Sequence, residues 1–137
     1  MRSETTEAQT QKIIYLVDDD AGVLKAVGRL LVSAGWAVRT FNEPASFLNY
    51  ASAHRVDLVV LDIWMNRMTG LDVLAHLCSL SPQTRIIIIT GREDMAVKSI
   101  AAQVGAVGFF IKPFDDNEFL TAVNYALAAA EPHETKV

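Results

Sequence analysis

The sequence predicts an α/β fold, (βα)5, in which five parallel strands form one sheet with helices on both faces. Between residues 12 and 130, short apolar segments alternate five times with segments of helical periodicity. Two of the apolar segments, LVVL at 58–61 and IIII at 86–89, are unbroken aliphatic runs, which is typical of strands covered by helices on both sides. Alternation of this kind predicts a doubly wound parallel sheet.

The strands are placed by apolar runs that end in polar or turn-forming residues. In chain order they are expected at Ile13–Val17, Ala37–Phe41, Leu58–Leu61, Arg85–Thr90 and Val107–Ile111.

A helix is expected after each strand. The first has apolar residues at helical spacing from Val23 to Leu31, with Asp20 as its N-cap and Gly35 where the chain must turn. Pro44 suits the first turn of the second helix. The remaining helices are expected over about Leu71–Leu80, Asp94–Val104 and Asp115–Ala130.

Length and composition indicate one globular domain. The chain has 137 residues, of which 51% are hydrophobic and 20% charged, and this is enough for a single sizeable core. We expect the domain to occupy residues 12–130, between a flexible N-terminal tail at 1–11 and a C-terminal tail at 131–137.

Hydropathy, charge and cysteine content exclude several kinds of protein. No apolar run approaches the ~20 residues needed to cross a bilayer. The N-terminal segment MRSETTEAQTQK lacks the apolar core of a signal peptide, so we expect a cytoplasmic protein without a membrane partner. The net charge of -4 argues against direct binding to nucleic acid. The single cysteine, Cys78, cannot form an internal disulfide, and we expect it to be a small buried or half-buried residue.

Polar residues with chemical capability follow four of the predicted strands. Asp18, Asp19 and Asp20 follow the first strand and Asp62 the third, while Thr90 ends the fourth and Lys112 follows the fifth. Each has an ordinary explanation alone, as a helix cap, a polar loop residue, a turn former or a surface lysine. Ligands of open parallel sheets bind outside the carboxyl ends of the strands, so together these residues predict one site.

The three carboxylates of Asp18, Asp19 and Asp62 would raise each other's pKa and destabilise the fold without a cation. Mg2+ resolves this repulsion, because it prefers one or two carboxylates together with water and phosphate oxygens. A carboxylate beside Mg2+, with a hydroxyl and an ammonium group in reach, is equipped to attack a phosphoryl group.

The segments VDDD, LDIWMNRMTG, IIIITG and FFIKPF together resemble the receiver domain of two-component response regulators. The resemblance covers Lys12 to Ala130, with 28 residues from Asp62 to Thr90 and 22 more to Lys112. It implies the flavodoxin-like strand order 2-1-3-4-5, and a signalling switch that promotes only its own phosphorylation and dephosphorylation rather than an enzyme.

The resemblance also implies how phosphate and metal would be held. Asp62 would be the phospho-acceptor. Asp19 would bind Mg2+ (or Mn2+) directly, Asp18 would act largely through water, and the main-chain carbonyl of Trp64 would be a further ligand.

Five further positions match the family pattern. Thr90 would bond a phosphoryl oxygen, and Lys112 would bridge to it. Phe109 stands where the family has its switch aromatic, often Tyr, so the switch is expected to rest on packing without a hydroxyl hydrogen bond. Gly70 matches the glycine after the phosphorylation loop, and the Lys112–Pro113 peptide bond is expected to be cis.

The segments after Asp62 and Thr90 contain one departure from the family pattern and two residues expected near the site. The family usually has Met-Pro where this sequence has Met65-Asn66, which should loosen the loop without removing chemistry. Trp64 and Arg92, each two residues past a site residue, are expected at the mouth of the pocket, where they would control water access. The alternative for Trp64 is that it is merely a partly exposed aromatic residue that contacts a partner.

The partners implied are a sensor histidine kinase or phosphotransfer protein as donor, and a downstream protein target or output domain as receiver of the signal. Phosphorylation would reshape the face made by the fourth helix, fifth strand and fifth helix. A phosphorylation-dependent homodimer stays open, and so does the choice between a stand-alone receiver and the excised receiver of a DNA-binding transcriptional regulator. A different class, a small phosphohydrolase with an Asp nucleophile, would use Asp18 and Asp20 as a DxD pair.

Overall fold

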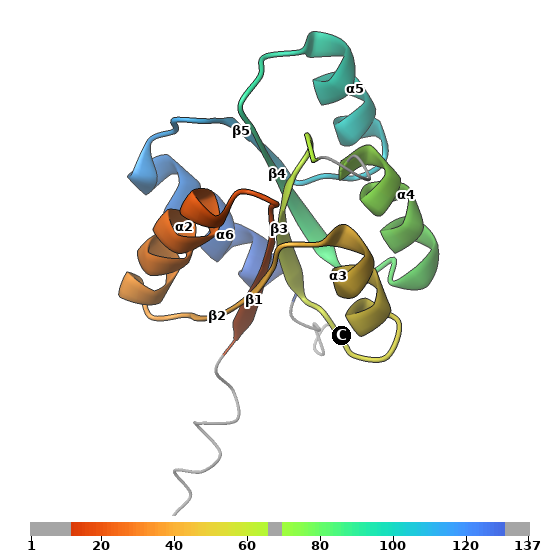
Figure 1. Ribbon diagram of the computed structural model, residues 1–137, viewed down its shortest axis with the longest axis horizontal. Helices are drawn as coiled ribbons and strands as arrows, with labels where there is room; N and C mark the ends of the chain where they lie inside the picture. Colours follow the sequence, from red (N-terminus) through yellow and green to blue (C-terminus); the bar gives the residue numbers. More distant parts are fainter. Residues whose placement is uncertain (1–11, 66–69, 131–137) are drawn as a thin grey trace, which may run out of the picture.

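The computed structural model describes residues 12–65 and 70–130, in which strands and helices alternate along the chain (Figure 1). The predicted strands and helices are all present, and the bounds given for them coincide with those of the structure or differ by one residue. In order they are β1 (Ile13–Val17), α2 (Ala21–Ser33), β2 (Ala37–Phe41), α3 (Pro44–Ala51), β3 (Leu58–Asp62), α4 (Gly70–Leu80), β4 (Arg85–Thr90), α5 (Met95–Gln103), β5 (Gly108–Ile111) and α6 (Asp116–Ala130).

The five strands form one parallel sheet in the order β2-β1-β3-β4-β5, as predicted. Its register aligns the carboxyl ends of the central strands. Val17 lies beside Leu61, and Thr90 lies beside Ile111. The residues that follow these positions therefore emerge at the same edge of the sheet.

Side chains alternate between the two faces of the sheet, and each face has its own core. Ile14, Leu16 and Val60 pack on one face under α2 and α6, where Phe119 and Val123 are fully buried. The opposite face packs under α3, α4 and α5 (Figure 1). Its buried residues include Val17, Val59, Leu61, Phe47, Val73, Leu77 and Val97.

The predicted helix ends are confirmed by their local geometry. The Asp20 carboxylate accepts hydrogen bonds from the main-chain N–H groups of Gly22 and Val23, which caps α2. Gly35 and Gly105 follow α2 and α5 with φ of 104° and 103°, a conformation that only glycine adopts without strain. Pro44 occupies the first turn of α3.

The expectation for Cys78 is wrong, because its side chain is exposed. It lies on α4 one residue past the buried Leu77, which turns it out of the core, and its thiol lies 3.5 Å from the carbonyl oxygen of Val104. Within the described residues, the helices are too short or too polar to cross a membrane.

Candidate functional site

The sheet brings the three predicted carboxylates together at the carboxyl ends of β1 and β3. Ligand oxygens of Asp18, Asp19 and Asp62 all lie within 4.8 Å of one another. Asp18 and Asp62 are buried and Asp19 is half-buried. Residues more than 40 positions apart in the sequence therefore form one cluster because β1 and β3 are neighbours in the sheet.

Lys112 places a cation beside two of these carboxylates. Its Nζ lies 3.3 Å from Asp18 Oδ2 and 3.6 Å from Asp62 Oδ1. Its main-chain N–H donates to the carbonyl oxygen of Thr90 at 2.6 Å, which fixes the start of the β5–α6 loop against β4. The peptide bond from Lys112 to Pro113 is cis, as expected.

Burial raises the pKa of both inner carboxyl groups. For Asp62 the pKa rises to about 6, because burial and the neighbouring charge of Asp18 outweigh Lys112 and the main-chain N–H of Trp64. For Asp18 burial also raises the pKa, while the N–H of Asp20 and the Lys112 ammonium oppose that rise. Ionisation of the buried Asp18 and Asp62 carboxyl groups is therefore costly, and Lys112 offsets that cost only in part.

A hard divalent cation fits this donor set. Carboxylate oxygens are the ligands that Mg2+ prefers, and the uncompensated charge favours a cation over an anion or a neutral ligand. Asp18, Asp19 and Asp62 are the residues that would hold such an ion.

Asp20 does not belong to the cluster. Its side chain is exposed and committed to the cap of α2, while its main-chain N–H donates to Asp18 Oδ1 at 2.9 Å. The DxD pair of the phosphohydrolase alternative therefore lacks its second carboxylate.

Gly70 is needed because the chain passes very close to the site. A Cβ at this position would lie 2.6 Å from the main-chain oxygen of Asp62 and from Cα of Ile63. The Gly70 N–H also donates to the Ile63 carbonyl at 2.8 Å. Glycine thus lets the start of α4 pack directly on the segment after Asp62.

Thr90 is fully buried at the end of β4, and its hydroxyl bonds to the main chain of Arg92. The Arg92 guanidinium lies 4.5 Å from the centre of the half-buried Trp64 ring. The two residues expected at the pocket mouth therefore contact each other. Phe109 is half-buried in β5, with Lys98 Nζ 5.9 Å from its ring centre. Asn66 lies outside the described residues.

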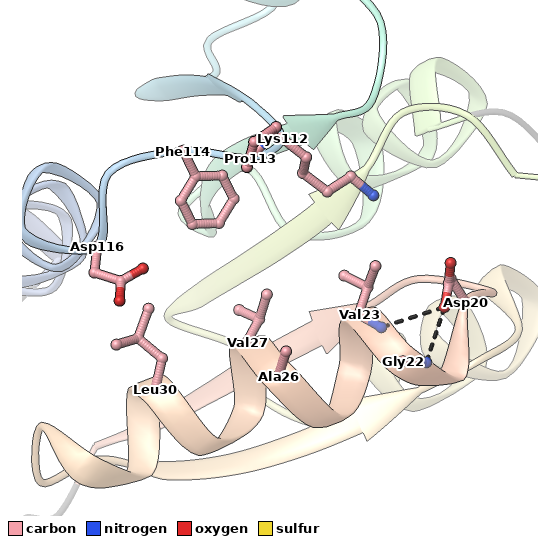
Figure 2. Close-up of a pocket in the computed structure, with 10 residues that line it drawn as sticks. All are labelled: Asp20, Gly22, Val23, Ala26, Val27, Leu30, Lys112, Pro113, Phe114 and Asp116. Atoms are coloured by element: carbon pink, nitrogen blue, oxygen red, sulfur yellow. Dashed lines mark hydrogen bonds between the residues drawn. The ribbon is translucent and has the colours of Figure 1, made fainter.

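A groove of about 560 Å³ adjoins the cluster between α2 and the β5–α6 loop. Figure 2 shows Lys112 and Phe114 on one side, facing Val23, Val27 and Leu30 of α2 on the other. Helical spacing placed these helix residues on one apolar face; Val27 is buried, while Val23 and Leu30 are half-buried and pack against the core cluster. Asp20, Gly22, Ala26, Pro113 and Asp116 complete the lining.

Comparisons with known proteins agree with this geometry. The family model for the response regulator receiver domain matches residues 14–124. The chain belongs to this family. It is 42% identical over 122 residues to the response regulator protein TmoT of Ectopseudomonas mendocina, covering 88% of this chain and 54% of TmoT. It is 43% identical over 120 residues to TodT of Pseudomonas putida, covering 86% and 52%.

The solved structures include a similar full-length protein, FixJ from B. japonicum. It superposes with a TM-score of 0.82 at 32% identity, over 90% of this chain and 61% of FixJ. This chain spans about half the length of the curated relatives TmoT and TodT. Membership of the family makes this chain a two-component signalling switch rather than a catalytic enzyme.

Proposed function

We propose that Asp62 accepts a phosphoryl group from a phosphohistidine on a sensor histidine kinase or phosphotransfer protein. A carboxylate oxygen of Asp62 attacks phosphorus, the phosphorus–nitrogen bond to the donor imidazole breaks, and an acyl phosphate forms. The observation that supports this most directly is the cluster of three carboxylates within 4.8 Å, beside the Lys112 ammonium. At neutral pH a carboxyl group with a pKa of about 6 is mostly ionised and can act as nucleophile.

Asp19, Asp18, Asp62 and the main-chain carbonyl of Trp64 are the ligands we propose for Mg2+. The ion, when bound, would supply positive charge that neutralises the negative charge on the phosphoryl oxygens. Lys112 is within reach of Asp62 and would form an ion pair with the new phosphoryl group. Thr90 would turn its hydroxyl toward the same group, and Phe109 would move into the space that Thr90 leaves.

The surface that would transmit this change carries exposed apolar side chains. Among the described residues, most of the large hydrophobic side chains that are exposed belong to α5, α6 and the β5 region between them. We propose that this face contacts a downstream protein, an output domain or a second copy of the chain. These residues are Met95, Ile100, Val104, Val107, Ile111 and Tyr125.

The donor protein would dock on the groove beside Lys112. The groove is largely apolar, and its lining includes the lysine that contacts Asp18 and Asp62, so a protein seated there would bring its phosphohistidine to the site (Figure 2). A cytoplasmic location follows from this donor. FixJ is named a transcriptional regulatory protein, and control of transcription is the output we propose.

Phosphorylation by acetyl phosphate with Mg2+, read by mass spectrometry of the intact protein, tests the acceptor. Wild type should gain one phosphoryl group, and so should Asp20→Asn, because the Asp20 side chain caps α2 and lies outside the carboxylate cluster. Asp62→Asn should gain none. Equal phosphorylation of the Asp62→Asn variant would refute the assignment.

Phosphotransfer from a phosphorylated kinase domain tests the groove. Ala26→Glu places a charge in the groove from an exposed helix position and should slow transfer from the kinase while leaving acetyl phosphate reactivity unchanged. Val32→Glu, on the same helix but outside the groove lining, is the matched control. Equal kinase rates for the two variants would place the donor elsewhere.

A further inference from the structure

Two loops at the edge of the site are joined by a contact between Trp64 and Arg92. The Arg92 guanidinium carbon lies 4.5 Å from the centre of the indole ring, a distance at which a cation and an aromatic face attract each other. Trp64 lies in the loop after β3, and Arg92 in the loop after β4. The contact therefore connects the loop that follows Asp62 to the loop that follows Thr90.

Each member of this pair also holds a site residue through its main chain. The Trp64 N–H donates a hydrogen bond to the Asp62 carboxylate. The Arg92 N–H donates to Thr90 Oγ1 at 3.1 Å, and the Thr90 hydroxyl lies 3.3 Å from the Arg92 carbonyl oxygen that it donates to. The Thr90 hydroxyl thus has its donor hydrogen and one of its two acceptor lone pairs engaged by Arg92.

We infer that the Trp64–Arg92 contact is a clasp that holds Thr90 in its resting position and so opposes activation. Thr90 cannot turn its hydroxyl toward a group on Asp62 without giving up its bonds to Arg92. The loop after β4 is then released, and the guanidinium loses the support that keeps it over the indole ring. Trp64 and Arg92 act as positioning residues, and this inference rests on the function proposed above for Asp62 and Thr90.

The indole N–H of Trp64 adds a reason for the clasp to open. Among the described residues, Trp64 Nε1 is buried and has no hydrogen-bond partner, an arrangement that is costly for a buried donor. The polar end of the ring therefore does not anchor it, and the ring is held by packing against the core under α3, α4 and α5 and by the contact with Arg92. Release of Arg92 removes one of these two restraints, so the indole can shift toward a position where its N–H is satisfied.

The test uses beryllofluoride with Mg2+ as a stable mimic of the phosphoryl group, with its affinity measured by calorimetry. Arg92→Ala should bind beryllofluoride about two- to five-fold more tightly than wild type, the change expected for loss of one exposed cation–aromatic contact. Arg92→Lys keeps a cation, so its affinity for beryllofluoride should lie between those of wild type and Arg92→Ala. Arg39→Ala is the matched control, because Arg39 lies on β2, 4.5 Å from the centre of the Tyr50 ring and outside the candidate site, and its loss should leave the affinity unchanged.

Tryptophan fluorescence gives a readout that a merely structural role would not move. The chain has two tryptophans, so Trp36→Phe leaves Trp64 as the single emitter. Beryllofluoride should shift the Trp64 emission in this background. Adding Arg92→Ala should shift the emission before any ligand is present and shrink the response to beryllofluoride.

The outcomes separate the clasp from the proposed function. If wild type does not bind beryllofluoride, or if Asp62→Asn binds it equally, the proposed function fails and the clasp fails with it. If wild type binds but Arg92→Ala matches Arg39→Ala in affinity, the clasp is wrong and the function stands. Weaker binding by Arg92→Ala also overturns the clasp, because it would mean that Arg92 contacts the bound group.

Discussion

Replacing Asp62 with asparagine should stabilise the metal-free protein at neutral pH. Burial and the charge of Asp18 raise the pKa of Asp62 from its ordinary 3.8 to about 6, and the residue is 3% exposed. Each tenfold change in proton affinity corresponds to about 1.4 kcal/mol, so ionised Asp62 costs the folded state about 3 kcal/mol at pH 7.5. The asparagine side chain carries no charge and avoids this cost, while Lys112 keeps its ion pair with Asp18.

The pH dependence has a definite sign. The folded state holds the Asp62 proton more tightly than the unfolded state, so this group's contribution to stability is complete below pH 3.8 and is lost as the pH rises through about 6. The advantage of Asp62→Asn should therefore be largest above pH 7 and fall to roughly half at pH 5, where wild-type Asp62 is mostly protonated.

Urea unfolding in EDTA at pH 7.5 and pH 5 measures this difference, and Glu43→Gln serves as control. Glu43 is an exposed N-cap residue of α3 without a side-chain cap bond, so its neutralisation should change stability by less than about 0.5 kcal/mol. Mg2+ should reduce the difference in unfolding free energy between wild type and Asp62→Asn at pH 7.5, because it stabilises wild type more than that variant. An Asp62→Asn protein that is no more stable than wild type in EDTA at pH 7.5 would refute the account of a repulsive, under-compensated cluster.

Two further changes test the packing of the site, and urea unfolding measures both. Lys112→Ala leaves the buried carboxylates of Asp18 and Asp62 without their nearby ammonium, so we expect the free energy of unfolding in EDTA to fall by about 2–3 kcal/mol. Mg2+ should partly restore this loss. A loss that Mg2+ does not change would contradict the view that Lys112 and the metal ion compensate the same charge. Gly70→Ala should cost at least about 2 kcal/mol, because its Cβ meets main-chain atoms at 2.6 Å. Gly28→Ala is the control, because this position lies in a helix and the new Cβ has nothing within 4 Å. It should raise the free energy of unfolding by about 0.5–1 kcal/mol. Equal effects of the two substitutions would show that the close approach at Gly70 is not the cause.

The meeting of the carboxylates could be predicted from sequence because it depends only on sheet topology. Parallel strands place their carboxyl ends at one edge, and the unbroken runs before Asp62 and Thr90 fixed where two of those ends lie. The helix caps were equally accessible, since Asp20 and Gly35 act through their own local main chain.

Contacts between loops could not be predicted in the same way. Trp64 and Arg92 were placed at the pocket mouth from their spacing after Asp62 and Thr90, but spacing does not reveal that their side chains stack. The groove was missed for a related reason. Helical periodicity marks Val23 and Leu30 as apolar-face residues, and only the path of the β5–α6 loop decides that they line a groove instead of being sealed in the core.

The unequal position of Lys112 connects the stability of the site to its proposed chemistry. Each of the two inner carboxylates accepts one main-chain N–H, Asp18 from Asp20 and Asp62 from Trp64. The Lys112 ammonium lies closer to Asp18 than to Asp62, so Asp62 is the carboxylate that it compensates less. A pKa of about 6 still leaves Asp62 ionised at neutral pH, yet makes it more basic than an ordinary aspartate. Greater basicity favours attack on phosphorus, and transfer replaces a poorly compensated carboxylate with a phosphoryl group that Lys112 can reach. The burial of Asp62 and its repulsion by Asp18, which lower the stability of the resting protein, are therefore the same features that would favour its phosphorylation.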